Sequence, residues 1–189
     1  SFALTQRYGV SRERLRVLDP HPRPLALWHH FTQNVGMSHL RSSFVHHLHY
    51  DPWSLRTFAA SRRGEPLAHY IPKFNRPALD LLNAYHEWLI DHYALAALRL
   101  QGRATGLHRR ADCWQVETDG GALTARQVVL AMGASEERND PAWAAHRPEA
   151  QHIFDPAFKR ADLTPWDDVG VVGAGISAAQ TALALLQDN

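Results

Sequence analysis

The stretch DVGVVGAGISAAQTALALL, at residues 168–186, constrains the fold more than any other part of the sequence. It begins with valines, continues with a Gly-Ala-Gly turn and ends in alanines and leucines, which is the order strand, turn, helix. In such a fingerprint the first glycine, Gly173, permits the tight turn, and the second, Gly175, lets the backbone approach a pyrophosphate. The sequence therefore predicts the start of a dinucleotide-binding Rossmann unit here.

The other positions of this fingerprint fit the same interpretation. Ala178 is small enough for the helix to pack closely on the strand, and a pyrophosphate would lie at the helix N-terminus. The predicted cofactor-binding residues are Gly173, Ala174, Gly175, Ile176, Ser177 and Ala178. A glycine-rich turn without a ligand is the alternative. The residue that selects NAD or NADP lies about 20 residues further on, beyond Asn189, so the sequence predicts NAD(P)H without distinguishing the two.

Asp19 is a second candidate for nucleotide binding. It ends the strand-like residues 15–18, which follow what looks like the last turns of a helix ending at Gly9. An acidic residue at the end of the second strand of a Rossmann unit accepts hydrogen bonds from an adenosine ribose. An Asp-Pro turn without a ligand is the alternative role for Asp19.

Charge and cysteine content exclude several classes of function. The 20 basic and 19 acidic residues leave a formal net charge of +1, so we expect neither nucleic acid nor a membrane surface as partner. Cys113 is the single cysteine, which excludes an internal disulfide and a Cys-x-x-Cys site within this sequence. We expect a cytoplasmic protein with a small-molecule substrate.

Between the two candidate nucleotide elements, the pattern predicts a helix, a hairpin and a buried strand. The helix would follow Asn75 as its cap, with Pro77 near its first turn, and present an apolar face that includes Tyr85 and Trp88. Residues 114–118 alternate and a turn at 119–121 leads into a second strand, which indicates a β-hairpin. The apolar run at 128–131 predicts a strand buried on both faces.

The sequence contains 13 histidines, several of them clustered at 29–30 and 46–49. A transition-metal site needs three or four ligands converging from fixed elements, and no Cys ligand set or H-E-x-x-H motif accompanies these histidines. We therefore expect no metal site and interpret the histidines as surface or packed residues.

Taken in order, these pieces resemble the flavoprotein monooxygenases with two dinucleotide-binding domains, and within them the lysine and ornithine N-monooxygenases. The resemblance covers most of the chain. Its most specific parts are residues 124–133, which look like the segment where the chain leaves the FAD domain, and 173–178, which look like the NADPH fingerprint. Residues 37–42, with Tyr85 and Trp88, resemble family positions around the flavin.

The resemblance implies an α/β fold: a partial Rossmann-like FAD domain with a β-hairpin or meander insert at 1–135, a connector at 136–165, and the start of a second Rossmann, NAD(P)-binding domain at 166–189. It implies FAD and NAD(P)H as cofactors and places Asp19 and Gly133 at the FAD. Arg41 is a candidate partner of a flavin or nicotinamide phosphate, with a solvated surface arginine as the alternative. We expect the chain to be an internal fragment, inactive alone, because the first FAD glycine motif would precede Ser1.

The implied activity is that of an FAD- and NAD(P)H-dependent oxidoreductase, a flavoprotein monooxygenase acting on a small nucleophile such as an amine. Two departures stand out: Met132 occupies the place of the usual threonine, and His152 lies in only part of a Baeyer-Villiger signature, with His146 and Pro148 where Phe and Gly are expected. The alternatives are a flavin-dependent pyridine nucleotide reductase and a non-catalytic dinucleotide-binding sensor.

Overall fold

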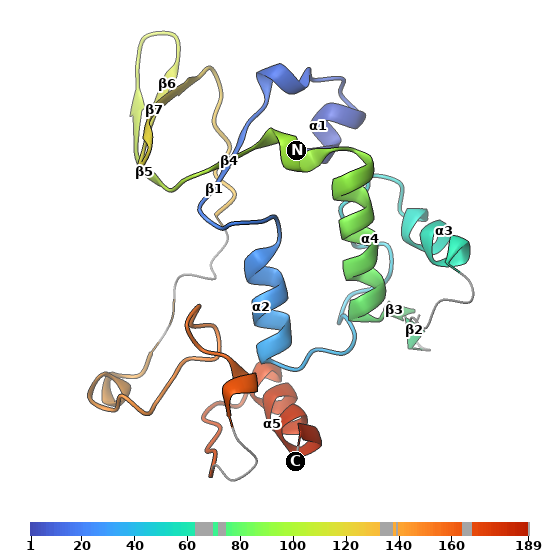
Figure 1. The fold of residues 1–189 in the computed structure, drawn as a ribbon, viewed down its shortest axis with the longest axis vertical. Coiled ribbons are helices and arrows are strands. Elements are labelled where there is room, and N and C mark those ends of the chain that lie inside the picture. Colours follow the sequence, from blue (N-terminus) through green and yellow to red (C-terminus); the bar gives the residue numbers. More distant parts are fainter. Residues whose placement is uncertain (63–69, 72–74, 133–137, 139, 164–167, 189) are drawn as a thin grey trace. The chain divides into compact units, whose positions relative to one another are not determined.

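The computed structural model describes residues 1–62, 70–71, 75–132, 138, 140–163 and 168–188. The chain divides into two compact units, one formed by Ser1–Pro24 with Ser38–Gln127 and the other by Leu25–Met37 with Val128–Asn189. The fold is α/β, with parallel and antiparallel strand pairs and a partial Rossmann-like arrangement, as the sequence predicts (Figure 1).

The first unit contains most of the regular structure. Its helices are α1 (Phe2–Gln6), α3 (Ser54–Ser61) and α4 (Leu79–His92), with short 3-10 turns at Arg12–Arg14 and Leu95–Leu98. Its strands are β1 (Val17–Asp19), β2 (Tyr70–Ile71), β3 (Arg76–Pro77), β4 (Arg99–Gln101), β5 (Ala104–Arg109), β6 (Trp114–Thr118) and β7 (Gly121–Ala125).

The Rossmann-like part of the first unit is the parallel pair β1–β4. Val17 lies opposite Arg99, and Asp19 lies opposite Gln101, so Asp19 ends its strand as predicted. A parallel pair needs a long crossover between its strands, and here that crossover contains α2, α3 and α4. The arrangement places the carboxyl end of β1, the usual nucleotide-binding end of such a strand, at Asp19.

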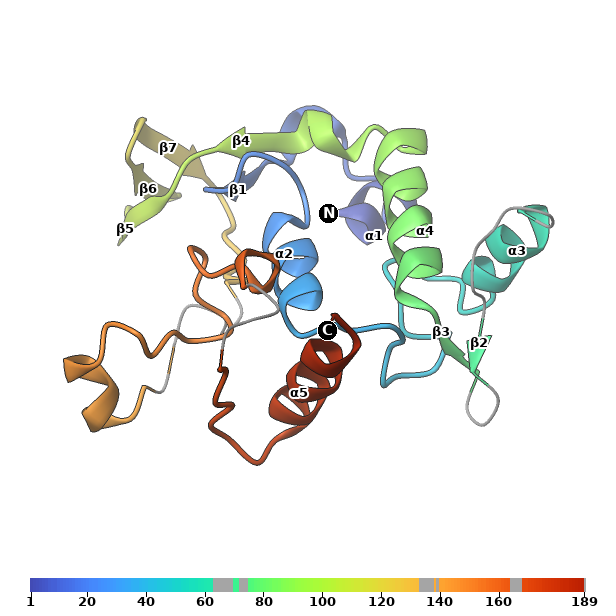
Figure 2. The ribbon, with the colours of Figure 1, turned by 60° about the horizontal axis from the view of Figure 1, so that its bottom comes forward.

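The predicted hairpin is confirmed and is part of a three-stranded antiparallel meander, β5–β6–β7. Thr118 pairs with Gly121 across the turn at Asp119 and Gly120, and Trp114 pairs with Ala125 at the other end. Gly121 has a φ of +125°, which favours glycine there. Figure 2 shows the meander and α4 in a second orientation.

The apolar face of α4 forms the core of the first unit, as its spacing predicts. Leu81, Leu82, Tyr85 and Leu89 are buried along it, and Leu55 and Phe58 of α3 are buried with them. The rings of Phe58 and Tyr85 lie 5.2 Å apart. Each buried leucine contributes about 2 kcal/mol through the hydrophobic effect, so this face holds α3 and α4 together.

The predicted cap of α4 is wrong. The helix begins at Leu79 after Ala78 and has no side-chain cap, whereas Asn75 lies four residues upstream with a φ of +45°. Asparagine tolerates the left-handed backbone better than most residues, and Asn75 serves the turn into β3 instead.

The second unit contains α2 (Ala26–Asn34) and α5 (Ile176–Asp188), with short 3-10 turns at Ala142–His146 and Arg160–Asp162. Helix α2 ends in a Schellman motif: the Met37 N–H donates to the Thr32 carbonyl (2.9 Å) and the Gly36 N–H to the Gln33 carbonyl (3.1 Å). Gly36 adopts the left-handed conformation that this motif needs, with a φ of +64°.

Two predicted strands of this unit are not observed. Residues 128–131 and 169–172 pair with no strand of the described ranges, and Val129 and Leu130 are 83% and 66% exposed. A strand needs a neighbour for its backbone hydrogen bonds, and the sheet β1–β4 has only two strands among the described residues. The apolar runs were correctly identified, but their burial was not.

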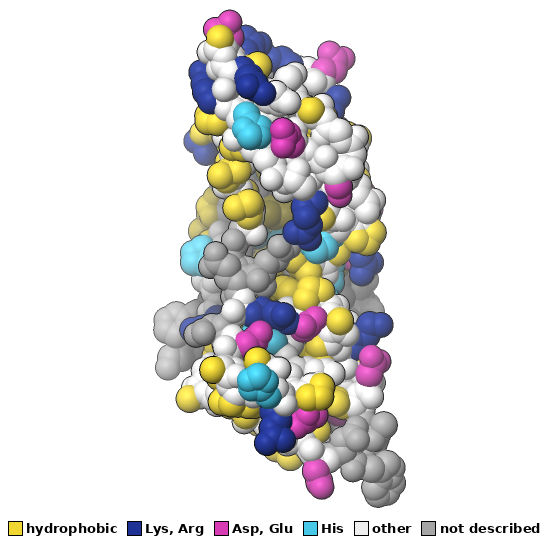
Figure 3. All heavy atoms as spheres, turned by 90° about the vertical axis from the view of Figure 1, so that its left-hand side faces the viewer, with side chains coloured by type: hydrophobic (Ala, Val, Ile, Leu, Met, Phe, Trp, Pro, Cys, Tyr) yellow, Lys and Arg dark blue, Asp and Glu magenta, His cyan; other side chains and the backbone are white. Residues whose placement is uncertain are grey.

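The charges on the face of the molecule drawn in Figure 3 are mixed: Lys and Arg side chains are interspersed with Asp and Glu side chains. This agrees with the near balance of 20 basic and 19 acidic residues in the sequence. Within the described ranges, no helix has both the length and the apolar character needed to cross a membrane.

Candidate functional site

The glycine fingerprint forms a turn directly before α5. Gly173 has a φ of +141°, a backbone conformation that favours glycine, and a Cβ there would lie 3.4 Å from the Cβ of Ala178. A Cβ on Gly175 would meet nothing within 4 Å among the described residues, so space over the second glycine is open. The turn therefore has the small residues and the open backbone that a pyrophosphate requires.

The N-terminus of α5 lies at this turn. Ala179 donates to the Gly175 carbonyl at 3.2 Å. In an α-helix the N–H groups of the first turn have no acceptor within the helix, and together with the helix dipole they attract an anion. Residues 173–176 are exposed, while Ser177 and Ala178 are half-buried. The structure thus brings the six predicted fingerprint residues together in one element that fits a dinucleotide.

Helix α5 is held in the second unit at its other end. Ala184 is buried, and a Cβ built on Gly36 would lie only 2.2 Å from the Ala184 Cβ. The end of α2 and the last turns of α5 therefore approach each other more closely than a side chain at position 36 would allow. The guanidinium of Arg160 pairs with Asp188 near the end of α5.

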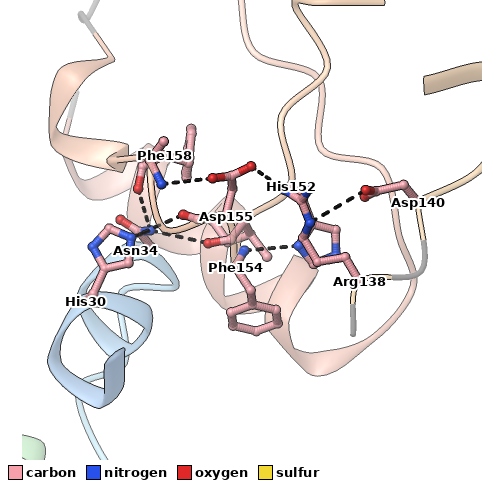
Figure 4. Close-up of polar contacts among 10 residues, drawn as sticks. His30, Asn34, Arg138, Asp140, His152, Phe154, Asp155 and Phe158 are labelled. Carbon is pink, nitrogen blue, oxygen red and sulfur yellow. Dashed lines mark hydrogen bonds and ion pairs between the residues drawn. The ribbon is translucent and has the colours of Figure 1, made fainter. Parts of the chain in front are cut away.

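Part of the predicted connector is bound to α2 through Asn34, whose side chain is 3% exposed (Figure 4). Its Nδ2 donates to the carbonyls of Phe158 (2.8 Å) and Ile153 (3.2 Å). Its Oδ1 accepts the N–H of Arg160 at 3.2 Å. Both amide hydrogens and the amide oxygen are thus used on the backbone of 153–160, which fixes the path of this segment against α2.

Further contacts support this connector segment. His30, one helical turn before Asn34, contacts the Asp155 carbonyl through Nε2 at 3.2 Å. The Ala157 N–H donates to the Asp155 carboxylate at 2.8 Å and Arg138 pairs with it; these contacts lower the pKa of Asp155 below its ordinary value. The segment that contains His152 is therefore an ordered loop built on α2.

Asp19 lies in the first unit, where several hydrogen bonds fix its turn. Its Oδ1 accepts the backbone N–H of His21 at 2.8 Å, and its carbonyl accepts the N–H of Gly102 at 3.1 Å. Among the described residues, no partner is found for its Oδ2. Asp19 therefore makes the Asp-Pro turn and also retains a carboxylate oxygen that can accept from a ribose hydroxyl.

Arg41 lies beside the start of α4. Residues 38–40 run antiparallel to 77–79, with the Leu40 N–H donating to the Pro77 carbonyl and the Leu79 N–H to the Ser38 carbonyl, both at 2.9 Å. The Arg41 side chain is exposed and makes no hydrogen bond or ion pair within the described part of the chain. Its position is compatible with either of the roles that the sequence left open.

Tyr85 belongs to the core of the first unit. It is fully buried, its hydroxyl lies 2.6 Å from the Ser54 Oγ, and burial raises its pKa to about 12. Trp88 is half-buried and stacks on His92, with ring centroids 4.8 Å apart. The apolar face of α4 is thus a packing surface, as the sequence favoured.

The other predicted residues are Gly133 and the clustered histidines. Gly133 lies outside the described residues. The histidines at 47 and 49 pack with Tyr85 and Phe2, and across the described residues no three His, Cys, Asp or Glu side chains are arranged to hold a metal ion. Asp19 and Arg41 lie in the first unit, whereas the fingerprint lies in the second.

Sequence reasoning missed three residues that organise these elements: Asn34, Gly36 and Arg99. The glycine after an amphipathic helix is a known signal for a helix end and could have identified Gly36. Nothing local marks Asn34, because its partners lie more than 100 residues away in the sequence. Arg99 contacts the turn that contains Asp19, from the neighbouring strand β4.

Comparison with known proteins gave one match, to a family. Neither the search of curated proteins nor the search of solved structures found a match. A profile of the family described as FAD-NAD(P)-binding matches residues 1–135, which is most of the chain. The chain therefore belongs to the FAD-NAD(P)-binding family, and it is a dinucleotide-binding oxidoreductase with FAD and NAD(P)H as its cofactors.

Proposed function

We propose that the protein is a flavoprotein monooxygenase that uses NAD(P)H and FAD to oxygenate a small nucleophile such as an amine. One observation carries the proposal. The family match ends at residue 135, and a separate glycine turn with an open helix N-terminus follows at 173–178. This supports two dinucleotide-binding elements in one chain, as expected where a nicotinamide cofactor reduces a flavin.

The residues assigned to each element have different tasks. The turn at Gly173 and Gly175, with the first N–H groups of α5, binds the pyrophosphate of NAD(P)H. The free carboxylate oxygen of Asp19 accepts from the adenosine ribose of FAD. When bound, FAD supplies the redox chemistry, taking a hydride from NAD(P)H and passing electrons to O2. The chain itself supplies binding and orientation.

The proposed reaction balances as NAD(P)H, a proton, O2 and the substrate giving NAD(P)⁺, water and the singly oxygenated substrate. A disulfide reductase would need a redox-active cysteine pair, and a Cys-x-x-Cys motif elsewhere in the full-length protein would favour that alternative. The resemblance to the amine N-hydroxylating branch supports an amine as the nucleophile.

The test uses the purified full-length protein with FAD, a panel of primary amines and isotopically labelled O2. NAD(P)H should first reduce the flavin without oxygen, and labelled oxygen should then appear in the amine product in proportion to the NAD(P)H consumed. Alcohols of the same carbon skeleton, which lack the nucleophilic nitrogen, are the matched control substrates. Flavin reduction without labelled product would indicate a pyridine nucleotide reductase, and flavin that NAD(P)H never reduces would indicate a sensor.

A further inference from the structure

Arg99 lies on β4, the strand next to Asp19, and its side chain reaches both ends of the turn that follows β1. Its Nη1 donates to the Pro22 carbonyl at 3.1 Å, and its Nη2 to the Asp19 carbonyl at 3.4 Å. The two acceptors are three residues apart, so one guanidinium bridges the turn. A planar fork with fixed donors is suited to such a bridge, and a lysine ammonium is not.

Arg99 binds backbone carbonyls at this turn, and the carboxylate of Asp19 has a different partner. Oδ1 accepts the His21 N–H, a bond inside the turn that Arg99 spans, and this bond sets the direction of the carboxylate. Within the described part of the chain, Asp19 makes no direct ion pair, and its second oxygen stays available as an acceptor. A charged acceptor makes a stronger hydrogen bond to a hydroxyl than a neutral acceptor does.

The partial burial of the Arg99 guanidinium is unfavourable for the free energy of folding. Its Nε is buried without a hydrogen-bond partner among the described residues. An unsatisfied buried donor is unfavourable for folding, so the position of the guanidinium depends on its two carbonyl contacts. Both contacts are made to the turn that follows β1.

We propose that Arg99 is a positioning residue for FAD binding: by bridging the Asp19 and Pro22 carbonyls it aims the Asp19 carboxylate at the adenosine ribose. The inference rests on the proposed function, which assigns Asp19 to FAD. The inference extends that proposal because it names Arg99, on the neighbouring strand β4, as the residue that sets the direction of the Asp19 carboxylate.

The test measures equilibrium binding of two ligands to the flavin-free, full-length protein: FAD, and FAD whose adenosine ribose lacks its 2′-hydroxyl. The unaltered protein should bind FAD about tenfold more tightly than the deoxy ligand, the scale of one charge-assisted hydrogen bond. Arg99→Lys should lose most of this preference while binding the deoxy ligand as before. A merely structural role for Arg99 would weaken both ligands equally.

Two further variants separate the possible outcomes. Arg110→Lys is the control, because the guanidinium of Arg110 contacts the Gln115 side chain in the meander, away from the turn at Asp19, and it should keep the full preference. Asp19→Ala should abolish the preference, and adding Arg99→Lys to it should cause no further loss, since the two act in series. Should Arg99→Lys not fold, Arg99→Gln, which keeps one amide donor, is measured in the same way.

The results distinguish this inference from the assignment on which it rests. If Asp19→Ala loses the preference but both Arg99 variants keep it, Arg99 is not a positioning residue. If Asp19→Ala binds FAD as tightly as the unaltered protein does, the assignment of Asp19 to FAD is wrong, whatever the Arg99 variants do.

Discussion

The two proposed dinucleotide-binding elements, the turn at Asp19 and the glycine fingerprint at 173–178, differ in how their backbone is held. At the end of β1, the Asp19 carbonyl accepts from Gly102 and Arg99, and its carboxylate accepts from His21. At the fingerprint turn, residues 173–176 are exposed, and the close packing of α5 lies at Ala184, toward the other end of the helix. The turn at Asp19 is fixed by hydrogen bonds where the ligand would bind. The fingerprint turn is fixed by packing at the far end of α5, away from where its ligand would bind.

The difference follows from what each element must recognise. A single carboxylate oxygen selects a ribose hydroxyl only if its direction is fixed, because one hydrogen bond is strongly directional. Several N–H groups at a helix end attract a pyrophosphate through their summed partial charges, which tolerate small displacements. Substitutions should therefore act differently at the two elements. At Asp19, we expect effects from substitutions in the turn itself. At the fingerprint, we expect effects both from substitutions in the turn and from substitutions where α5 packs at its other end.

The largest effect is expected at the second glycine of the fingerprint. In the full-length protein, Gly175→Val fills the open space over the turn with a branched side chain and should reduce NAD(P)H-dependent flavin reduction at least about 100-fold, leaving FAD bound. Stopped-flow flavin absorbance measures the rate. Gly170→Ala is the control, because a Cβ there also meets nothing within 4 Å but lies outside the turn. Loss of FAD with unchanged reduction would reverse the assignment of the two elements.

The next largest effect is expected at Asn34, which holds the connector segment against α2 in the second unit. Asn34→Leu leaves the carbonyls of Ile153 and Phe158 and the N–H of Arg160 without their buried partner, and should lower the free energy of unfolding by about 3 to 5 kcal/mol. Urea unfolding measures it. Gln33→Leu, one position earlier and exposed, should change stability by less than about 0.5 kcal/mol. Equal losses in the two variants would contradict the role of the Asn34 amide.

A smaller loss is expected from Gly36→Ala. The new Cβ would overlap the Ala184 Cβ, and the residue would keep its positive φ, so we expect a loss of about 2 to 3 kcal/mol. Adding Ala184→Gly removes the overlap and should restore about half of the loss, leaving the backbone strain. Thermal unfolding of both variants measures this, and no recovery would show that the close approach is not the cause.

The smallest effect is a pH dependence that separates the two units. In the first unit, Nδ1 of His47 accepts the His49 N–H, and Nδ1 of His49 accepts the Asp51 N–H, so the neutral rings are the folded form. Burial lowers the pKa of both histidines below 6.5. The unfolded chain therefore binds more protons just below pH 6.5, and stability should fall as the pH decreases from there.

In the second unit, the contacts of Asp155 lower its pKa below 3.8, so its contribution is present above that pH and is lost only in stronger acid. Acid should thus weaken the unit that contains Asp19 first. Urea midpoints at several pH values test this. The double variant His47→Asn, His49→Asn keeps oxygen acceptors that do not titrate in this range and should flatten the decline between pH 7 and 5. An unchanged decline would exclude these histidines as its source.

Local signals in the sequence identified much of the fold and part of the site. The fingerprint at 173–178, the helix that contains Tyr85 and the hairpin turn at 119–121 all depend on neighbouring residues, and the structure has each of them. The strand that ends at Asp19 was found for the same reason, two residues shorter than expected.

What the sequence could not show depends on distant partners. The apolar runs at 128–131 and 169–172 have strand composition, but a strand exists only where another strand pairs with it. The local sequence around Asn34 looks like that of any asparagine in a helix. Its role depends on hydrogen bonds to carbonyls far along the chain. The sequence predicted a connector at 136–165 but gave no sign that residues 153–160 within it form an ordered loop on α2.

The membership of Leu25–Met37 in the second unit bears on how such proteins can be recombined. A chimera that exchanges everything after residue 135 for a homologous sequence would keep α2 but remove the residues that pack on it. Phe31 would lose Phe154, whose ring centroid is 5.3 Å away, and Gly36 would face an unrelated helix. Productive crossovers should therefore transfer residues 25–37 together with 128–189, as two inserts that are exchanged as one unit.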